Sequence, residues 1–268
     1  MFYPISKPFF YLFIFLCIFL LFGGNSLAQF TETEVSIPSG PIELAGTLSL
    51  PQAAEEGGLP AILIIPGARA WDRNGNIKDG VQYGHYRDIA DYLASQGFIV
   101  LRYDKRGTGE SSGRLPKRDF MLARDSMSAF NWLNEQPQVD KGKIVLLGHS
   151  QGTRIAVTIA AKAESLAAAV LLSPVIKAVA ANYFKCPVLM VRGERDEDIF
   201  QEDVDNVIKA FREAGNTNCR SLLIPGANHL FFDVAEGIPD YNDPLTTVHP
   251  ELLEEISAWL KEVLHIEN

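Results

Sequence analysis

The chain has 268 residues, of which 47% are hydrophobic and 21% are charged, and its formal net charge is −9. This is the composition of an ordinary globular protein with ample material for one core, which excludes an intrinsically disordered chain. An acidic surface is a poor partner for nucleic acid and is repelled by anionic membranes, so we expect neither as a partner.

The first 28 residues differ from the rest of the chain. Lys7 is their only charged residue, residues 9–22 form an unbroken apolar run, and residues 26–28 (Ser-Leu-Ala) resemble a signal-peptidase site. The apolar run is shorter than the ~20 residues that span a bilayer, which favours a secretory signal over an uncleaved anchor. We therefore expect a signal peptide at 1–28 and an exported mature chain, periplasmic or extracellular, without stable membrane insertion. Loss of Lys7 changes the formal charge from −9 to −10.

Residues 29–268 are expected to form a single domain in which strands and helices alternate. An antiparallel pair of strands at 31–37 and 42–50 comes first, and continuous apolar runs then predict parallel strands that are buried on both faces. These strands are expected at 61–65, 98–103, 144–148, 167–172, 187–191 and 220–224, and helices at 86–96, 119–136, 153–161, 202–214 and 250–264. The pattern predicts an α/β fold with an eight-stranded, mostly parallel sheet covered by helices on both faces.

The stretch 144–161 joins an apolar run, the pentapeptide Gly-His-Ser-Gln-Gly at 148–152 and a helix-forming segment. Gly-x-Ser-x-Gly between a strand and a helix is typical of a nucleophile elbow. The turn is so tight that it requires residues without a side chain at 148 and 152. Ser150 is expected in a strained backbone conformation with its hydroxyl exposed above the strand. The alternative interpretation is a glycine-rich turn without chemistry.

Two later strands precede residues that can activate a serine. In open α/β sheets ligands bind beyond the carboxyl ends of the strands, and His229 follows the strand at 220–224. A serine hydroxyl needs a base with a pKa near 7, and a carboxylate on the far nitrogen of the imidazole sets its tautomer. We predict Asp196, after the strand at 187–191, as this carboxylate. Asp198 and Glu194 stay open as alternatives in the same loop.

Four segments together resemble the α/β-hydrolase family, and the resemblance extends from about residue 40 to 264. They are residues 148–152, 103–111 (Tyr-Asp-Lys-Arg-Gly-Thr-Gly-Glu-Ser), 193–196 (Gly-Glu-Arg-Asp) and 228–231 (Asn-His-Leu-Phe). The resemblance implies Ser150 as the nucleophile, Asp196 as the acid and His229 as the base. It also implies that Asp104 and Arg106 brace the loop near the elbow and do not react.

An oxyanion hole needs two backbone N–H groups directed at the tetrahedral intermediate. Gln151, which follows the nucleophile, is expected to provide one of them. The resemblance implies that the other comes from the loop after the strand at 61–65, where many relatives have His-Gly-x and this chain has Pro-Gly-Ala at 66–68. We assign Ala68, with Arg69 as the alternative. His85, after the following loop, is a weaker candidate for substrate contact, and Trp71 and Tyr83 are expected at the surface.

Other sequence features limit the remaining possibilities. We expect no metal, because no His/Cys spacing of the structural type is present, and no cofactor, because no Gly-x-Gly-x-x-Gly follows a strand. Many α/β-hydrolases insert a lid where this chain has only residues 173–186, so we expect an open site roofed by 69–84 and 237–248. Cys186 and Cys219 each precede one of two neighbouring strands, which predicts a disulfide away from the site.

The combined prediction is an exported serine hydrolase that acts on a small-molecule carboxylic ester or acyl compound through an acyl-enzyme. Two alternatives use the same three residues, namely a serine peptidase and an acyltransferase. A third alternative, a binding protein on an inactive scaffold, is disfavoured by the intact serine, acid and histidine.

Overall fold

The structure is a computed structural model that describes residues 30–233 and 247–266, except 53, 55–57 and 164. The expected signal peptide at 1–28 and most of the expected roof at 237–248 therefore lie outside the described residues.

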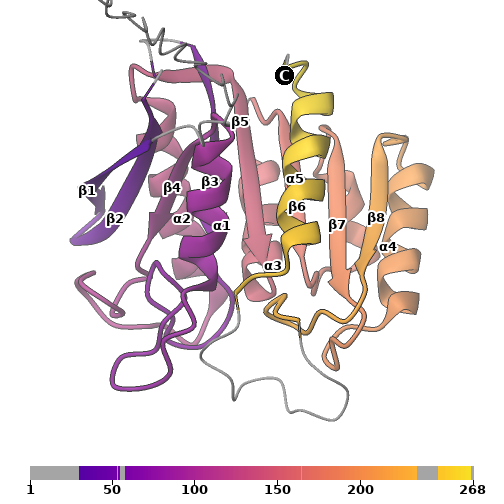
Figure 1. Ribbon diagram of the computed structural model, residues 1–268, viewed down its shortest axis with the longest axis horizontal. Helices are drawn as coiled ribbons and strands as arrows, with labels where there is room; N and C mark the ends of the chain where they lie inside the picture. Colours follow the sequence, from indigo (N-terminus) through magenta and orange to yellow (C-terminus); the bar gives the residue numbers. More distant parts are fainter. Residues whose placement is uncertain (1–29, 53, 55–57, 164, 234–246, 267–268) are drawn as a thin grey trace, which may run out of the picture.

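One eight-stranded sheet organises the described chain (Figure 1). The strands are β1 (Phe30–Ser39), β2 (Ile42–Pro51), β3 (Leu59–Ile65), β4 (Ile99–Tyr103), β5 (Val139–His149), β6 (Ala168–Leu172), β7 (Val188–Gly193) and β8 (Cys219–Ile224). They lie in the order β1-β2-β4-β3-β5-β6-β7-β8. The β1–β2 and β2–β4 pairs are antiparallel and all other pairs are parallel, so the expected fold class is confirmed.

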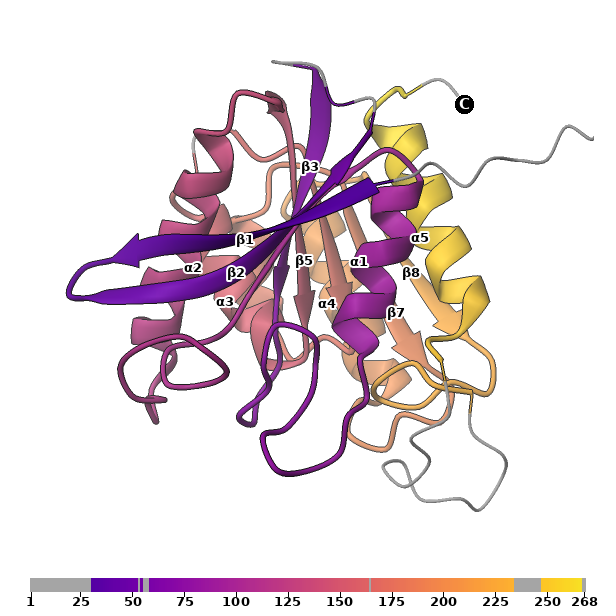
Figure 2. The same ribbon diagram turned by 60° about the vertical axis from the view of Figure 1, so that its left-hand side comes forward.

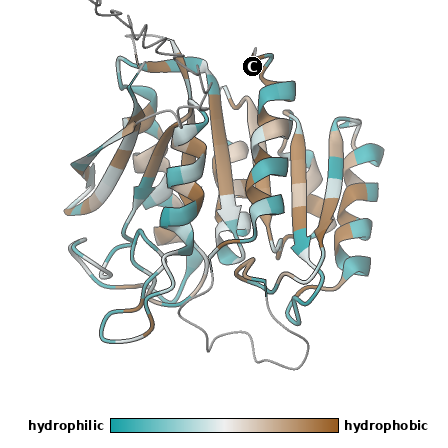
Figure 3. Cartoon of the chain, viewed as in Figure 1, coloured by the Kyte–Doolittle hydropathy of each residue, from teal (hydrophilic) through white to brown (hydrophobic). Residues whose placement is uncertain are grey.

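Helices cover both faces of this sheet and create two hydrophobic layers. They are α1 (His85–Ser95), α2 (Asp119–Asn134), α3 (Gln151–Ala160), α4 (Gln201–Glu213) and α5 (Pro250–Val263). Alternate residues of a strand point to opposite faces. Ile62 and Ile64 of β3 accordingly belong to the hydrophobic layer that includes α1 and α5, whereas Leu63 and Ile65 belong to the layer that includes α2, α3 and α4. Burial on both faces explains why the central strands are mostly apolar, as the brown colouring along β5 and β7 in Figure 3 shows.

The β1–β2 hairpin extends away from the centre of the sheet and lies beside α2 (Figure 2). Ser39 at the end of β1 donates a hydrogen bond of 2.6 Å to Asp125 of α2. The carboxyl ends of the parallel strands all meet at the opposite edge from the carboxyl terminus of the chain, and the connecting loops gather there (Figure 1). Ser150, Asp196 and His229 follow β5, β7 and β8, so the predicted site residues lie at this edge of the sheet.

The connection between β6 and β7 contains a single 3₁₀ helix, η1 (Ala178–Asn182), and no inserted lid, as expected. Within the described ranges, no helix combines the length and apolar character needed to cross a membrane.

The prediction of a disulfide between Cys186 and Cys219 is wrong, because both cysteines are free and buried. The register of the β7–β8 pair places Cys219 opposite Val188, two residues beyond Cys186. The Cys219 thiol lies instead 3.3 Å from the carbonyl oxygen of Asn216. The positions of the two cysteines before neighbouring strands did not define the register of those strands. A disulfide requires a register that brings the two cysteines close together.

Candidate active site

Ser150 forms the turn between β5 and α3, with backbone angles φ 49° and ψ −116°. A positive φ is strained for a residue that carries a side chain. The conformation is held by the Ser150 N–H group, which donates to the carbonyl of Leu172 at 2.9 Å. A Cβ atom at Gly148 would lie 2.8 Å from the carbonyl oxygen of Gly152, and one at Gly152 would lie 2.1 Å from that of Ile65. The expected elbow geometry and its need for both glycines are confirmed.

His229 lies after β8 in a turn that is closed by the side chain of Asn228. The side-chain oxygen of Asn228 accepts hydrogen bonds from the N–H groups of Leu230 and Phe232 at 3.0 and 2.9 Å. An asparagine that bonds the backbone ahead of it defines such a turn locally. The turn directs the imidazole towards the loop after β7, where Nδ1 of His229 lies 2.9 Å from Oδ1 of Asp196.

The geometry distinguishes the three carboxylates that the sequence left open. Asp196 is hydrogen-bonded to His229 and its side chain is 0% exposed, whereas Asp198 lies 3.9 Å from Nδ1 and its side chain is 68% exposed. Glu194 accepts instead from the N–H of Gly226 at 2.9 Å. Asp196 is therefore the carboxylate that orients the imidazole.

The environment of Asp196 favours its charged form. Burial by itself raises the pKa of this carboxyl group, but the hydrogen bond and the charge of His229 outweigh burial, so its pKa is below the usual value. The N–H groups of Asp198 and Ile199 add hydrogen bonds of 3.0 and 3.2 Å to the same oxygen. Because a carboxylate only accepts, Nδ1 of His229 carries the proton and Nε2 is left as the basic nitrogen.

A pocket of about 100 Å³ brings the predicted residues together. Ser150, His229 and Ala68 all face it, while Asp196 lies behind His229 and Gln151 begins α3 directly after Ser150. The lining comprises Gly67, Ala68, Arg69, Trp71, His149, Ser150, Asp198, His229 and Leu230. Trp71 is 3% exposed, so its expected place at the surface is wrong. The predicted nucleophile, base and second oxyanion donor thus line one cavity.

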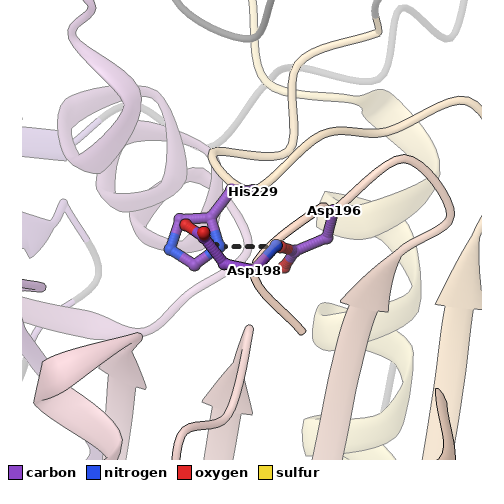
Figure 4. Close-up of side chains that lie close together, drawn as sticks. All are labelled: Asp196, Asp198 and His229. Atoms are coloured by element: carbon purple, nitrogen blue, oxygen red, sulfur yellow. Dashed lines mark hydrogen bonds and ion pairs between the residues drawn. The ribbon is translucent and has the colours of Figure 1, made fainter. Parts of the chain in front are cut away.

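Asp196, Asp198 and His229 also have the composition of a metal site, since their ligand atoms lie within 4.8 Å of one another (Figure 4). The hydrogen bond at Nδ1 places a proton on that nitrogen and removes the lone pair that a metal would need. The remaining two carboxylates, of which that of Asp198 is mostly exposed, make a poor set of metal ligands by themselves. The arrangement fits an imidazole oriented by an acid better than a metal centre.

Sequence reasoning missed a chain of buried hydrogen bonds beside the elbow. The N–H of Gly67 donates to the Tyr86 hydroxyl at 2.7 Å, and that hydroxyl lies 2.8 Å from Nδ1 of His149. Nε2 of His149 lies 2.9 Å from the carbonyl oxygen of His229, which can only accept, so Nε2 carries the proton. Burial first, and then the charge of His229, hold the pKa of His149 well below its usual value, so Tyr86 donates to a neutral ring.

Three further expectations can be compared with the structure. Asp104 accepts from the N–H of Arg73 at 2.6 Å and from that of Glu110 at 2.8 Å, and Arg106 forms a buried ion pair with Asp125. Both side chains brace the loop after β4, as the resemblance implied. His85 is buried outside the pocket lining, and burial lowers its pKa to about 3. The idea that His85 contacts substrate therefore has no support from its position.

Residues 80–181 match the protein family described as serine aminopeptidase, S33. A curated relative, the alpha/beta hydrolase domain-containing protein aho-3 of Caenorhabditis elegans, is 31% identical over 165 residues, which cover 53% of this chain and 48% of the relative. The chain therefore spans about half the length of the nematode protein.

Two other comparisons extend over more of the chain. An uncharacterized protein of Mycobacterium tuberculosis is 32% identical over 227 residues, covering 76% of this chain and 70% of the mycobacterial protein. The structure of the esterase Pf2001 of Pyrococcus furiosus superposes with a TM-score of 0.65 at 18% identity, covering 87% of this chain and 93% of the esterase. At that identity the structural similarity shows the fold alone.

Proposed function

This chain belongs to the α/β-hydrolase family, and we propose that it is a serine hydrolase that cleaves carboxylic esters through an acyl-enzyme. One observation supports the proposal more than any other. Ser150, in its strained turn, lines the same pocket as His229, and His229 is hydrogen-bonded to the buried Asp196. Nucleophile, base and orienting acid are thus available at one place.

The proposed reaction uses each of these groups in turn. Nε2 of His229 takes the proton of Ser150 as Oγ attacks the ester carbonyl carbon, and Asp196 stabilises the imidazolium that forms. The carbonyl oxygen becomes an oxyanion bound by the N–H groups of Gln151 and Ala68. The intermediate collapses, His229 returns the proton to the departing alcohol, and an acyl group stays on Ser150. A water molecule deprotonated by His229 then releases the carboxylic acid.

The size of the pocket favours a small reacting group. Its volume of about 100 Å³ is well below the roughly 300–1,000 Å³ of typical ligand pockets. The short β6–β7 connection adds no lid over the described part of the site. We expect a short acyl chain, or an ester that protrudes from a larger molecule. Export by the segment 1–28 is part of the same proposal and is supported by its sequence pattern.

A serine aminopeptidase is the second candidate, because residues 80–181 match the family of that description. The same serine, base and acid would attack an amide, and the acyl-enzyme would carry an amino acid. An acyltransferase would use the same acyl-enzyme with an acceptor other than water.

A fluorophosphonate probe tests the serine mechanism directly. We expect covalent labelling of the wild-type protein at Ser150 and none of Ser150→Ala. Ser165→Ala is a matched control, because Ser165 is exposed, lies outside the pocket lining and donates a hydrogen bond to the carbonyl of Lys141. Absence of labelling in the wild type would contradict the serine hydrolase.

Chromogenic substrates then separate the two candidates. Nitrophenyl acetate and butyrate report ester hydrolysis, and aminoacyl nitroanilides report aminopeptidase activity. We expect kcat/KM for the short esters to exceed that for the anilides by at least about 100-fold, a difference of roughly 3 kcal/mol in transition-state stabilisation. The reverse ranking would establish the peptidase instead.

A further inference from the structure

Lys105, directly after β4, is a buried cation that the proposed reaction leaves unused. Its side chain is only 2% exposed, and within the described residues it takes part in no salt bridge. Burying an ammonium group without a paired carboxylate is costly. A methionine of similar shape would fill the same space without that cost, so the charge at this position calls for a role.

The ammonium group of Lys105 instead contacts the loop that follows β3. Nζ donates to the carbonyl oxygen of Gly67 at 2.6 Å and also to the carbonyl oxygen of Arg69. These two carbonyls flank Ala68, which is exposed and lines the pocket that contains Ser150. Lys105 therefore holds the backbone on both sides of the residue that was predicted to donate to the oxyanion.

We propose that Lys105 is a positioning residue of the oxyanion hole. It orients and polarises the N–H group of Ala68 through the peptide group that joins Gly67 to Ala68. The role rests on the proposed serine hydrolase function. The carbonyl of Gly67 and the N–H of Ala68 belong to one planar peptide unit, and none of the described peptide bonds is cis. In a trans unit the two groups point in opposite directions. A carbonyl directed at the buried Nζ thus turns the N–H away from Lys105, towards the exposed side of the loop.

The other polar groups of this loop favour Ala68 over Gly67 as the oxyanion donor. The N–H of Gly67 is already used, because it donates to the Tyr86 hydroxyl at 2.7 Å. Tyr86 and Lys105 therefore hold the Gly67 backbone from two directions, one at its N–H and one at its carbonyl. A fixed donor costs no reorganisation when the oxyanion forms.

The positive charge of Lys105 should also strengthen the N–H of Ala68 as a hydrogen-bond donor, in addition to fixing its direction. A hydrogen bond to a peptide carbonyl polarises the unit and strengthens the N–H as a donor, and a charged donor is about twice as strong as a neutral one. Burial lowers the pKa of Lys105 to about 8, and the carboxylate of Asp119 at the start of α2 acts in the opposite sense. On the other side of Gly67 lie Tyr86, whose pKa burial raises, and the neutral ring of His149. Lys105 is therefore charged below about pH 8 and neutral above it.

Lys105→Met tests the proposal, with Ser111→Ala as the matched control. Ser111 lies in the same loop, but its hydroxyl donates to the carbonyl of Asp104 and accepts from the N–H of Ala45, and neither partner belongs to residues 67–69. We expect Lys105→Met to lower kcat for nitrophenyl butyrate by about 10- to 100-fold. This loss is smaller than the roughly 10²- to 10³-fold loss that removal of an oxyanion donor causes, because the N–H of Ala68 is still present. KM should change by less than about threefold. Affinity for a boronic acid that forms a tetrahedral adduct on Ser150 should fall in parallel. Ser111→Ala should change neither value by more than about threefold.

The pH profile separates this role from a general loosening of the loop. In the wild type and in Ser111→Ala, kcat should decline as pH rises through about 8, and this decline should be missing in Lys105→Met. Equal kcat and equal pH profiles for wild type and Lys105→Met, in an enzyme that the fluorophosphonate still labels, would overturn the proposal and leave the proposed function intact. If Lys105→Met does not fold, wild-type kcat that stays constant from pH 7 to 10 would overturn it equally. Absence of labelling in the wild type identifies failure of the proposed function itself.

Discussion

The hydroxyl group of Tyr86 lies 2.8 Å from Nδ1 of His149, and this contact connects the loop after β3 with the backbone of His229. Tyr86 accepts from the N–H of Gly67 on one side, and His149 donates from Nε2 to the carbonyl of His229 on the other. We therefore expect the backbone at Gly67 and the backbone at His229 to be coupled, because the hydrogen bonds of Tyr86 and His149 determine each other's donor and acceptor roles.

Tyr86→Phe should therefore impair both ends of this chain. It removes the acceptor of Gly67 N–H and the donor to His149, leaving two buried groups without a partner, which costs about 1–3 kcal/mol each. We expect kcat to fall roughly tenfold by loss of orientation at both ends, within the range of effects for positioning groups. Urea unfolding and steady-state kinetics measure the two effects. Tyr183→Phe, at an exposed position, is the control and should change neither.

Asp196→Asn should cause a far larger loss of activity than Asp198→Asn. An amide at 196 can hold His229 in the wrong tautomer and cannot stabilise its charged form, so we expect kcat to fall on the order of 10³–10⁴-fold. Asp198 is mostly exposed and lies 3.9 Å from the ring, so its substitution should cost less than about fivefold. Equal losses in the two variants would show that the two carboxylates share the role.

Asp196 should also make the stability of the protein depend on acid pH. Its pKa in the folded state is below the roughly 3.9 of an unfolded aspartate, because the interactions with His229 outweigh burial. The unfolded chain therefore binds the proton first, and the stabilising contribution is complete above about pH 4 and is lost as pH falls through the lower folded value. Urea unfolding at pH 2.5 to 6 should show the advantage of wild type over Asp196→Asn shrinking below about pH 4. A constant difference across that range would contradict the lowered pKa.

Gly152→Ala should destabilise the fold, because the new Cβ would lie 2.1 Å from the carbonyl oxygen of Ile65. A backbone carbonyl cannot move aside as the end of a flexible side chain can, so we expect a loss of more than about 3 kcal/mol in free energy of unfolding. Gly142→Ala is the matched control, since its Cβ would meet only the side chain of Asp140 at 3.3 Å. It should stay within about 1 kcal/mol of wild type.

The two cysteines should react as free thiols only after unfolding. Both are buried, and burial raises the pKa of the Cys186 thiol to about 12, which suppresses its reactive thiolate. In protein that begins at Gln29, a thiol reagent should detect almost no thiol in buffer and two per chain in urea without reductant. No thiol under the second condition would restore the disulfide that the sequence suggested.

The sequence by itself determined the elements and the elbow. Strands with continuous apolar runs are buried on both faces wherever they pack, so their positions follow from local composition, as β3 and β6 show. The elbow was equally local, because Gly148 and Gly152 are required by the backbone within a few residues of Ser150. The order of serine, acid and histidine followed from the placement of each after its strand.

Only the tertiary structure decided how the site is supported. Asp196 was distinguished from Asp198 by its hydrogen bond to His229, a residue of the turn after β8. Whether the two cysteines can pair depends on the register between β7 and β8. Lys105 contacts carbonyls 36 and 38 residues away in the sequence. Such contacts leave no periodic pattern in the chain, because a backbone carbonyl has the same chemistry in every residue. The elbow was therefore visible in the sequence, and the groups that hold the loop opposite it were not.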